Sequence, residues 1–389
     1  MRLPSFGTKL LCAFLLLFLA SSLSFGQTFT DVFVDCTGAM PGAFTSLNQA
    51  IANSPDNSDF QVIGTCTESA GVTIQNRRNL VIIADPTATI QTTTPGGELI
   101  LINHSQNIEI DNLTLNGGSG VNILDSSTIS LIGNTIENSS FFGIDSTNSD
   151  VLVVNGSVTG STRSGVVTSG GTVQIDGVNI SNNGRIGISS STTHLIISDG
   201  NNGGTIVNNN GIAGVQLSNS SQGDFTDLQI TNNAGNNFGL QAVTNSAVVM
   251  QGGSISGNTG VGVNCVSTTH CEFLQTQING NFGNGVQTTI HSELNLDGGV
   301  QISGNQGVGV LVDQHSAFAS NGGNTISGNT GDGLIVNALS TLDFLAPDTI
   351  TATAGNLALN CNNGSLVTGD ISTYKPKKCG VAFQAVPIH

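Results

Sequence analysis

The chain has 389 residues, a length that suits about two or three globular domains or one elongated repeat domain. Only 9% of the residues are charged and 5% are aromatic, whereas glycine accounts for 51 residues, and aliphatic residues are spread evenly through this polar background. The even spread argues against disorder, and the net charge of −16 makes nucleic acid and anionic membranes poor partners.

The first 26 residues have the pattern of a secretory signal peptide. Arg2 and Lys9 form a basic start, residues 10–20 an apolar core, and residues 24–26 a small-residue exit that leaves Gln27 as the mature terminus. The apolar run is too short to span a bilayer comfortably. We therefore expect a secreted chain, extracellular or periplasmic, without a membrane span. Without the signal peptide, seven basic residues face 25 acidic ones, so the net charge of the mature chain is −18.

One helical pattern follows the signal peptide. Phe44, Leu47, Ala50 and Ile51 are spaced so that they share one face of a helix over residues 44–51. Since this segment alone has helical periodicity, we expect an almost entirely β-structured chain.

A glycine followed by an aliphatic residue recurs ten times, at spacings of 22 to 27 residues, and a period this steady marks a solenoid. Within each unit, three short strand-like pieces are separated by Gly, Asn and Ser turns, as at residues 285–286, 294–296 and 300–302. Three strands per unit close one triangular coil. The pairs are Gly120-Val121, Gly143-Ile144, Gly165-Val166, Gly187-Ile188, Gly214-Val215, Gly239-Leu240, Gly262-Val263, Gly285-Val286, Gly309-Val310 and Gly333-Leu334.

Asparagine occupies one position in seven consecutive coils, three residues after an aliphatic marker such as Ile180 or Ile206. In parallel stacking, identical amides lie about 4.8 Å apart and can hydrogen-bond from coil to coil. We interpret this column as a structural ladder rather than a catalytic array. Its predicted rungs are Asn183, Asn209, Asn233, Asn258, Asn281, Asn305 and Asn329.

Together, the Gly-aliphatic strands, the Ile-x-x-Asn-x-Gly turns and the period resemble the right-handed parallel β-helix superfamily, which includes pectate lyases, polygalacturonases and alginate epimerases. The resemblance implies a single all-β domain, a right-handed parallel β-helix of about a dozen three-strand coils over residues 60–359. It also implies an N-terminal cap at residues 27–59, which contains a short helix, and a C-terminal cap at residues 360–389. Caps are needed because terminal coils expose unpaired strand edges and apolar core.

Enzymes of this superfamily act on extracellular polysaccharides. The hydrolases carry an Asn-Thr-Asp segment, an Asp-Asp pair and a Gly-His-Gly segment, none of which occurs in this sequence. The epimerase pattern Asp-Pro-His is also missing, since Asp85-Pro86 is followed by Thr87. This sequence could meet only the requirement of a lyase, an Arg or Lys base often assisted by Ca²⁺.

Two arginines and one aromatic residue hold the same place in consecutive coils. Phe141, Arg163 and Arg185 each lie five residues after the aliphatic marker of their coil, with Asp145 and Asp150 nearby in the sequence. We expect the first three to stack along one edge of the β-helix. Because guanidinium groups bind carboxylates through paired hydrogen bonds, this edge is a candidate subsite for an acidic sugar that packs on Phe141. The alternative interpretation is that the arginines offset the acidic surface.

Histidines and glutamates recur further along the chain. Aligning residues 270–273, 291–294 and 315–318 places three histidines in one column and two glutamates beside it, all facing solvent. Such a cluster could hold a transition metal, or it could be a stack of turn residues without a ligand. It lies too far along the axis from the arginines to form one active site with them. The candidate metal ligands are His270, Glu272, His291, Glu293 and His315.

Removal of the signal peptide takes Cys12 away and leaves six cysteines, an even number that indicates disulfides in an exported protein. Several connectivities remain open, and local pairs are favoured because two of them lie where the ends of a solenoid need closing. The favoured pairs are Cys36 with Cys66, Cys265 with Cys271, and Cys361 with Cys379.

The sequence leaves two functions open. The favoured one is a secreted β-helix protein whose non-catalytic surface binds glycans or a partner, and the alternative is a polysaccharide lyase acting on uronate polymers. The missing hydrolase and epimerase motifs and the scarcity of Arg, Lys and aromatic residues favour the first. No resident cofactor is expected, although Ca²⁺ or a transition metal is left open. The expected partner is an extracellular polysaccharide or a cell-surface molecule, and the oligomeric state is not indicated.

Overall fold

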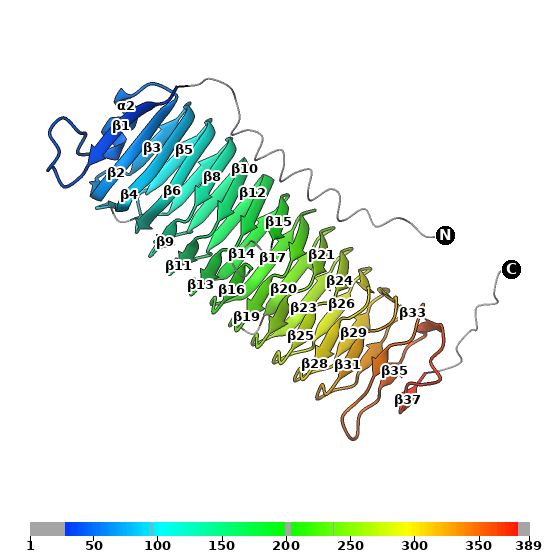
Figure 1. Cartoon of the computed structure of the whole chain (residues 1–389). Coiled ribbons are helices and arrows are strands. Elements are labelled where there is room, and N and C mark those ends of the chain that lie inside the picture. Colours follow the sequence, from blue (N-terminus) through cyan, green and yellow to red (C-terminus); the bar gives the residue numbers. More distant parts are fainter. Residues whose placement is uncertain (1–27, 95, 199–203, 236, 380–389) are drawn as a thin grey trace.

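The computed structural model describes residues 28–379, apart from residue 95, residues 199–203 and residue 236. The predicted signal peptide lies outside the described residues, as do the last ten residues of the predicted C-terminal cap. The described chain forms an elongated stack of β-coils that runs from one end of the molecule to the other in sequence order (Figure 1). Successive strands on each side pair in parallel, so the protein is a parallel β-solenoid.

Each coil contributes one strand to each of three faces, and a long strand that bends at a corner serves two faces. Face 1 follows the Gly-aliphatic pairs. It comprises β3 (Val72–Gln75), β5 (Ile100–Asn103), β7 (Val121–Leu124), the first parts of β10 (Ile144–Val154) and β12 (Val166–Asp176), β14 (Ile186–Ser191), β17 (Ala213–Ser218), β20 (Phe238–Val243), β23 (Val261–Val266), β26 (Val286–Thr289), β29 (Val310–Asp313), β32 (Leu334–Val336), β35 (Leu359–Cys361) and β37 (Lys377–Lys378).

Face 2 follows face 1 in each coil. It comprises β1 (Thr30–Asp35), the first parts of β2 (Ser58–Glu68), β4 (Arg78–Thr92) and β6 (Gln106–Asn116), β8 (Ser127–Ile132), the later parts of β10 and β12, β15 (His194–Ser198), β18 (Gln222–Thr226), β21 (Ala247–Gln251), β24 (His270–Leu274), β27 (Glu293–Leu296), β30 (Ala317–Ser320), β33 (Thr341–Phe344) and β36 (Leu366–Thr368).

Face 3 is built from the later parts of β2, β4 and β6 and from a series of very short strands. These are β9 (Thr135–Glu137), β11 (Ser157–Thr159), β13 (Asn179–Ser181), β16 (Ile206–Asn208), β19 (Gln229–Thr231), β22 (Ser254–Ser256), β25 (Gln277–Asn279), β28 (Gln301–Ser303), β31 (Thr325–Ser327) and β34 (Thr349–Ile350).

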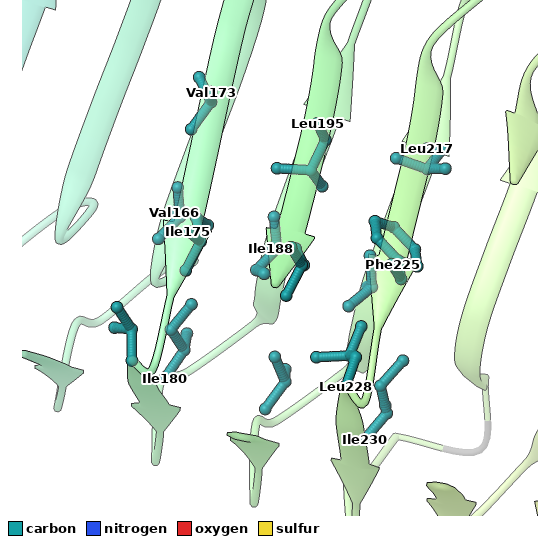
Figure 2. Packing of buried hydrophobic residues seen from close by; sticks show 14 of the residues in the cluster. Val166, Val173, Ile175, Ile180, Ile188, Leu195, Leu217, Phe225, Leu228 and Ile230 are labelled. Carbon is teal, nitrogen blue, oxygen red and sulfur yellow. The ribbon is translucent and has the colours of Figure 1, made fainter. Parts of the chain in front are cut away.

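The core lies inside the coils because alternate residues of every strand point inward. In the middle of the stack, aliphatic side chains from consecutive coils lie next to one another along the axis. Figure 2 shows this for Val166 and Ile188 on face 1 and for Val173 and Leu195 on face 2. Burying one such side chain contributes about 1.5 to 3 kcal/mol, and the repeat supplies several in every coil. The predicted aliphatic period therefore corresponds to the apolar centre of the solenoid.

The glycine of the repeat is required where face 3 turns into face 1. At Gly285, a Cβ atom would lie 2.5 Å from Cγ2 of Ile302, 2.6 Å from the carbonyl oxygen of Gly309 and 2.8 Å from Nδ2 of Asn305. Any side chain would therefore collide with the core and with the amide of the neighbouring coil. This close approach explains why glycine precedes the aliphatic residue in coil after coil.

The asparagine ladder is present, with one rung corrected. The predicted rung Asn209 is exposed and has a left-handed backbone, whereas Asn210 is fully buried and takes the place in the column. The reason is that Val207, not Ile206, is the inward residue paired with Ile180, so the count of three starts one position later. The hydrogen-bonded rungs are Asn183, Asn210, Asn233, Asn258, Asn281, Asn305 and Asn329, joined at 2.9 to 3.0 Å from Nδ2 to Oδ1.

A single short helix, α2 (Leu47–Asn53), closes the N-terminal end within the described residues. The Ser46 hydroxyl accepts from the backbone N–H of Gln49 at 3.2 Å, and the Glu68 carboxylate accepts from that of Leu47 at 2.7 Å. These bonds satisfy donors that the first turn leaves without a helical partner. The buried face of α2 matches the predicted one, except that Phe44 precedes the helix.

Parallel strand pairing extends into both predicted caps. β1 pairs in register with β2 inside the predicted N-terminal cap, and β35 pairs with β37 beyond residue 359. At the C-terminal end, the buried ring of Tyr374 lies 5.1 Å from that of Phe344.

The three favoured disulfides are formed, with Cα–Cα separations of 5.0, 6.5 and 4.6 Å in chain order. Cys265 and Cys271 lie inside one coil, on face 1 and face 2, and both are buried. Disulfides are typical of oxidising compartments. In the described part of the chain, no helix combines the length and the apolar character that crossing a bilayer requires.

Candidate functional site

Phe141, Arg163 and Arg185 form one column at the corner where face 3 turns into face 1. The backbone N–H of Arg163 donates to the carbonyl of Phe141 at 2.9 Å, and that of Arg185 donates to the carbonyl of Arg163 at 3.0 Å. The three residues are thus neighbours in consecutive coils. We refer to this column as the arginine edge.

One end of the arginine edge is aromatic. The guanidinium carbon of Arg163 lies 3.8 Å from the centre of the Phe141 ring, and this ring is 41% exposed. The neighbouring ring of Phe142 meets Phe141 edge-on, at 4.9 Å between ring centres. A guanidinium that lies on a ring is held by a cation–π interaction, which leaves its N–H groups available to a ligand. The edge can therefore offer oriented donors to an anion.

The two acidic residues near the arginine edge in sequence do not neutralise it. Among the described residues, no ion pair joins Arg163 or Arg185 to Asp145 or Asp150. Burial raises the pKa of Asp145, and no arginine counters this effect. In contrast, Arg77 is held by Asp56 at 2.8 Å and by backbone carbonyls, so it serves the structure.

The predicted column of three histidines is wrong. On face 2, His270 pairs with Glu293 and Glu272 pairs with Asn295, so the alignment of residues 270–273 with residues 291–294 is displaced by two positions. His291 and His315 do stack, with ring centres 5.3 Å apart, but they lie on the turn before face 2. No group of three His, Cys, Asp or Glu residues in the described chain is placed to hold a metal ion. The metal site thereby loses the geometry on which it was predicted.

His270 instead bridges two carboxylates. Its Nδ1 lies 3.2 Å from Oε2 of Glu293, and its Nε2 lies 3.6 Å from Oε2 of Glu272. Burial, followed by a hydrogen bond to Asp297 and its charge, raises the pKa of Glu272, while His270 opposes this shift. Because the two ring nitrogens of His270 face different carboxylates, these groups surround the imidazole and do not converge on one ion.

A second histidine–carboxylate pair on face 2 was missed in the sequence. Nε2 of His194 lies 2.6 Å from Oδ2 of Asp224, and the Gln222 amide donates to the same oxygen at 2.9 Å. Burial opposes ionisation of Asp224, but the bonds from His194 and Gln222 outweigh it and lower its pKa. The two residues are 30 positions apart in the sequence. They become neighbours because the inward residue Leu195 pairs with the inward residue Gly223, a register that the sequence alone did not show.

Residues 98–235 match the family model described as right handed beta helix region, which confirms the resemblance seen in the sequence. No curated protein matches the chain. Among solved structures, the A-module of mannuronan C-5 epimerase AlgE4 from Azotobacter vinelandii is 12% identical, with a TM-score of 0.49 over 87% of this chain and 92% of that one. The AlgE6 A-module from the same organism is 13% identical, with a TM-score of 0.46 over 83% of this chain and 94% of that one.

A structure of a different kind has a comparable likeness. PfbA, a surface adhesin of Streptococcus pneumoniae, is 10% identical, with a TM-score of 0.42 over 87% of this chain and 92% of that chain. At such identities the likeness concerns the fold alone.

Proposed function

We propose that this protein is secreted and binds an acidic extracellular polysaccharide at the arginine edge without carrying out a chemical step. The observation that supports this proposal most directly is the guanidinium of Arg163 on the exposed ring of Phe141, with Arg185 one coil further on. A ring can pack against a sugar, while two guanidinium groups donate to its carboxylates. The predicted signal peptide and the disulfides are in keeping with an extracellular site of action.

Binding suits the arginine edge better than lyase chemistry does. The lyase alternative needs an arginine or lysine that has lost its proton to act as the base, whereas an arginine side chain stays protonated in proteins. The carboxylates nearest in sequence, Asp145 and Asp150, form no ion pair with either arginine among the described interactions. The arginines can therefore hold an anion but are poor acceptors of its proton.

The test is calorimetric titration of oligouronates into the parent protein and into the double variant Arg163→Gln/Arg185→Gln. Each lost charge-assisted bond is worth about 1.5 to 3 kcal/mol, so affinity should fall at least about tenfold. The melting temperature should stay unchanged because both side chains lie outside the core. The matched control is Arg78→Gln, an exposed arginine on face 2 near the N-terminal end.

Because salt screens both the local attraction and the repulsion by the net negative chain, the affinities are measured at two salt concentrations. Ultraviolet absorbance of the mixtures shows whether unsaturated sugars form. Absence of binding by the parent, or equal affinity of parent and double variant at both salt concentrations, would refute the proposal. Formation of unsaturated products would replace it with the lyase alternative.

A further inference from the structure

The outer surface of face 2 carries its own set of polar groups, independent of the arginine edge. On β15 and β18, His194 and Gln222 hold the carboxylate of Asp224, and on β24 and β27, His270 contacts Glu272 and Glu293. We call the outer surface from β15 to β27 that carries these six residues the face-2 strip. Because the side chains hold one another in place, a ligand would order them at little further entropic cost.

The two halves of the strip are separated by one coil with small apolar side chains. β21 places Ala247 between Gln222 and His270, and Val249 between Asp224 and Glu272. Val249 is 38% exposed, although it is hydrophobic. The strip thus has an apolar centre with a histidine–carboxylate pair on either side, about 10 Å apart from Asp224 to Glu272 at the spacing of two coils.

Apart from the histidines, the ionisable side chains of this region are acidic. No lysine or arginine occurs anywhere between Arg185 and Lys375, a stretch that contains the whole strip. His194 and Gln222 both bond to Oδ2 of Asp224, and among the described bonds Oδ1 accepts only a weaker one, at 3.3 Å. On Glu293, the described contact uses Oε2. Each pair therefore retains a carboxylate oxygen that can accept from a ligand.

We propose that the face-2 strip binds a glycan that carries primary ammonium groups. An ammonium group complements the carboxylate oxygens that the bonds of the strip leave available or only weakly bonded. Sugar hydroxyls find partners in Oε1 of Gln222 and Nδ1 of His194, and the apolar face of a pyranose ring packs on Val249. A pyranose unit is about as long as the spacing between coils, so a chain laid along the axis presents successive units to successive coils. A uronate would be repelled, which distinguishes this site from the arginine edge.

The proposal goes beyond the function assigned to the arginine edge and does not depend on it. The test is titration, at mildly acidic pH where the sugar amine is protonated, of a glucosamine oligomer and of the N-acetylated oligomer of the same length. The glucosamine oligomer should bind at least about tenfold more tightly, because acetylation removes the charge that the carboxylates recognise. The double variant Asp224→Asn/Glu293→Gln should lose at least about tenfold in affinity for it.

The matched control is Asp313→Asn/Asp343→Asn, which removes the same charge from the same cation-free stretch but outside the strip. Its affinity should change by less than about twofold, since salt screens charges this far from the strip. Equal affinity for the two oligomers, or an equal loss in the control, would overturn the proposal. So would equally tight binding of an oligolysine of similar charge, which would assign the strip to basic peptides. Arg163→Gln/Arg185→Gln should bind the glucosamine oligomer as the parent does, which keeps the two sites distinguishable.

Discussion

Replacing one rung of the asparagine ladder with leucine tests whether the ladder is a stabilising device. Asn258 is fully buried, and its Oδ1 accepts from both the backbone N–H and the Nδ2 of Asn233 at 3.0 Å. Its Nδ2 donates to the carbonyl of Ile230 at 3.1 Å and to Oδ1 of Asn281 at 2.9 Å. Asn258→Leu would therefore remove four hydrogen bonds at once.

The magnitude follows from the groups left without partners. Two N–H donors of Asn233 and the carbonyl of Ile230 would lose the bonds that Asn258 provides, whereas Oδ1 of Asn281 keeps a bond from the backbone of residue 258. Each buried group without a partner costs about 1 to 3 kcal/mol, so three cost about 3 kcal/mol at the low end. That loss is a large part of the stability of an ordinary domain.

The measurement is urea denaturation of Asn258→Leu beside Asn295→Leu, a matched change on the outer surface of face 2. Hydrogen exchange on the neighbouring coils accompanies it, because a solenoid can lose structure locally without unfolding as a whole. We expect a loss of about 3 kcal/mol for the ladder variant and less than about 1 kcal/mol for the control. Equal losses would refute the reasoning, because the bonds of the ladder would then add nothing to stability.

The remaining predictions concern charge, covalent closure and secondary structure. Burial, followed by two neighbouring aspartates, raises the pKa of Glu109, so its contribution favours the fold at low pH and is lost as pH rises through the folded-state pKa. Glu109→Gln should therefore raise the melting temperature at neutral pH but not below about pH 4, and a lower value at neutral pH would contradict this. Removing Cys36–Cys66, which spans 30 residues, should cost about 3.6 kcal/mol, against about 2.2 kcal/mol for Cys265–Cys271, which spans six. A reversed order in denaturation of the serine variants would argue against loop closure as the cause. Circular dichroism should show mostly β-structure, and a helix content above about a quarter would exclude the fold.

The architecture could be predicted because it depends on a period, and a period survives local irregularities. The aliphatic spacing, the glycine before face 1 and the asparagine after face 3 are each repeated many times, so one anomalous coil does not hide the pattern. One disulfide could be predicted because parity places Cys265 and Cys271 inside the same coil, and the other two because their cysteines lie near the ends of the solenoid. Phe141, Arg163 and Arg185 were found to be neighbours because the coils that separate them have equal length.

The positions that sequence reasoning missed lie where coil length changes. Between the coils of Asn183 and Asn210 the aliphatic marker moves by one residue, and the predicted rung moved with it to Asn209. The likeness of the segments after His270 and His291 suggested a register that the inward pairing of Cys271 with Leu294 rules out. In the first case, burial of an apolar side chain decides the register, since a slip of one residue would expose it. In the second case the slip is of two residues and keeps the same side chains inward, so only the pairing of the strands decides the register.

The same rule explains why the histidine–carboxylate pairs arise where they do. In a parallel solenoid the neighbours of a side chain on the outer surface are set by the inward register of the coils above and below it. Leu195 opposite Gly223 brings His194 beside Gln222 and within reach of Asp224, and Cys271 opposite Leu294 brings His270 beside Glu293. The inward residues therefore determine which charged groups meet on the surface. A slip of one residue within a strand would exchange inward and outward positions, and the cost of exposing the core would prevent the pairs from drifting apart.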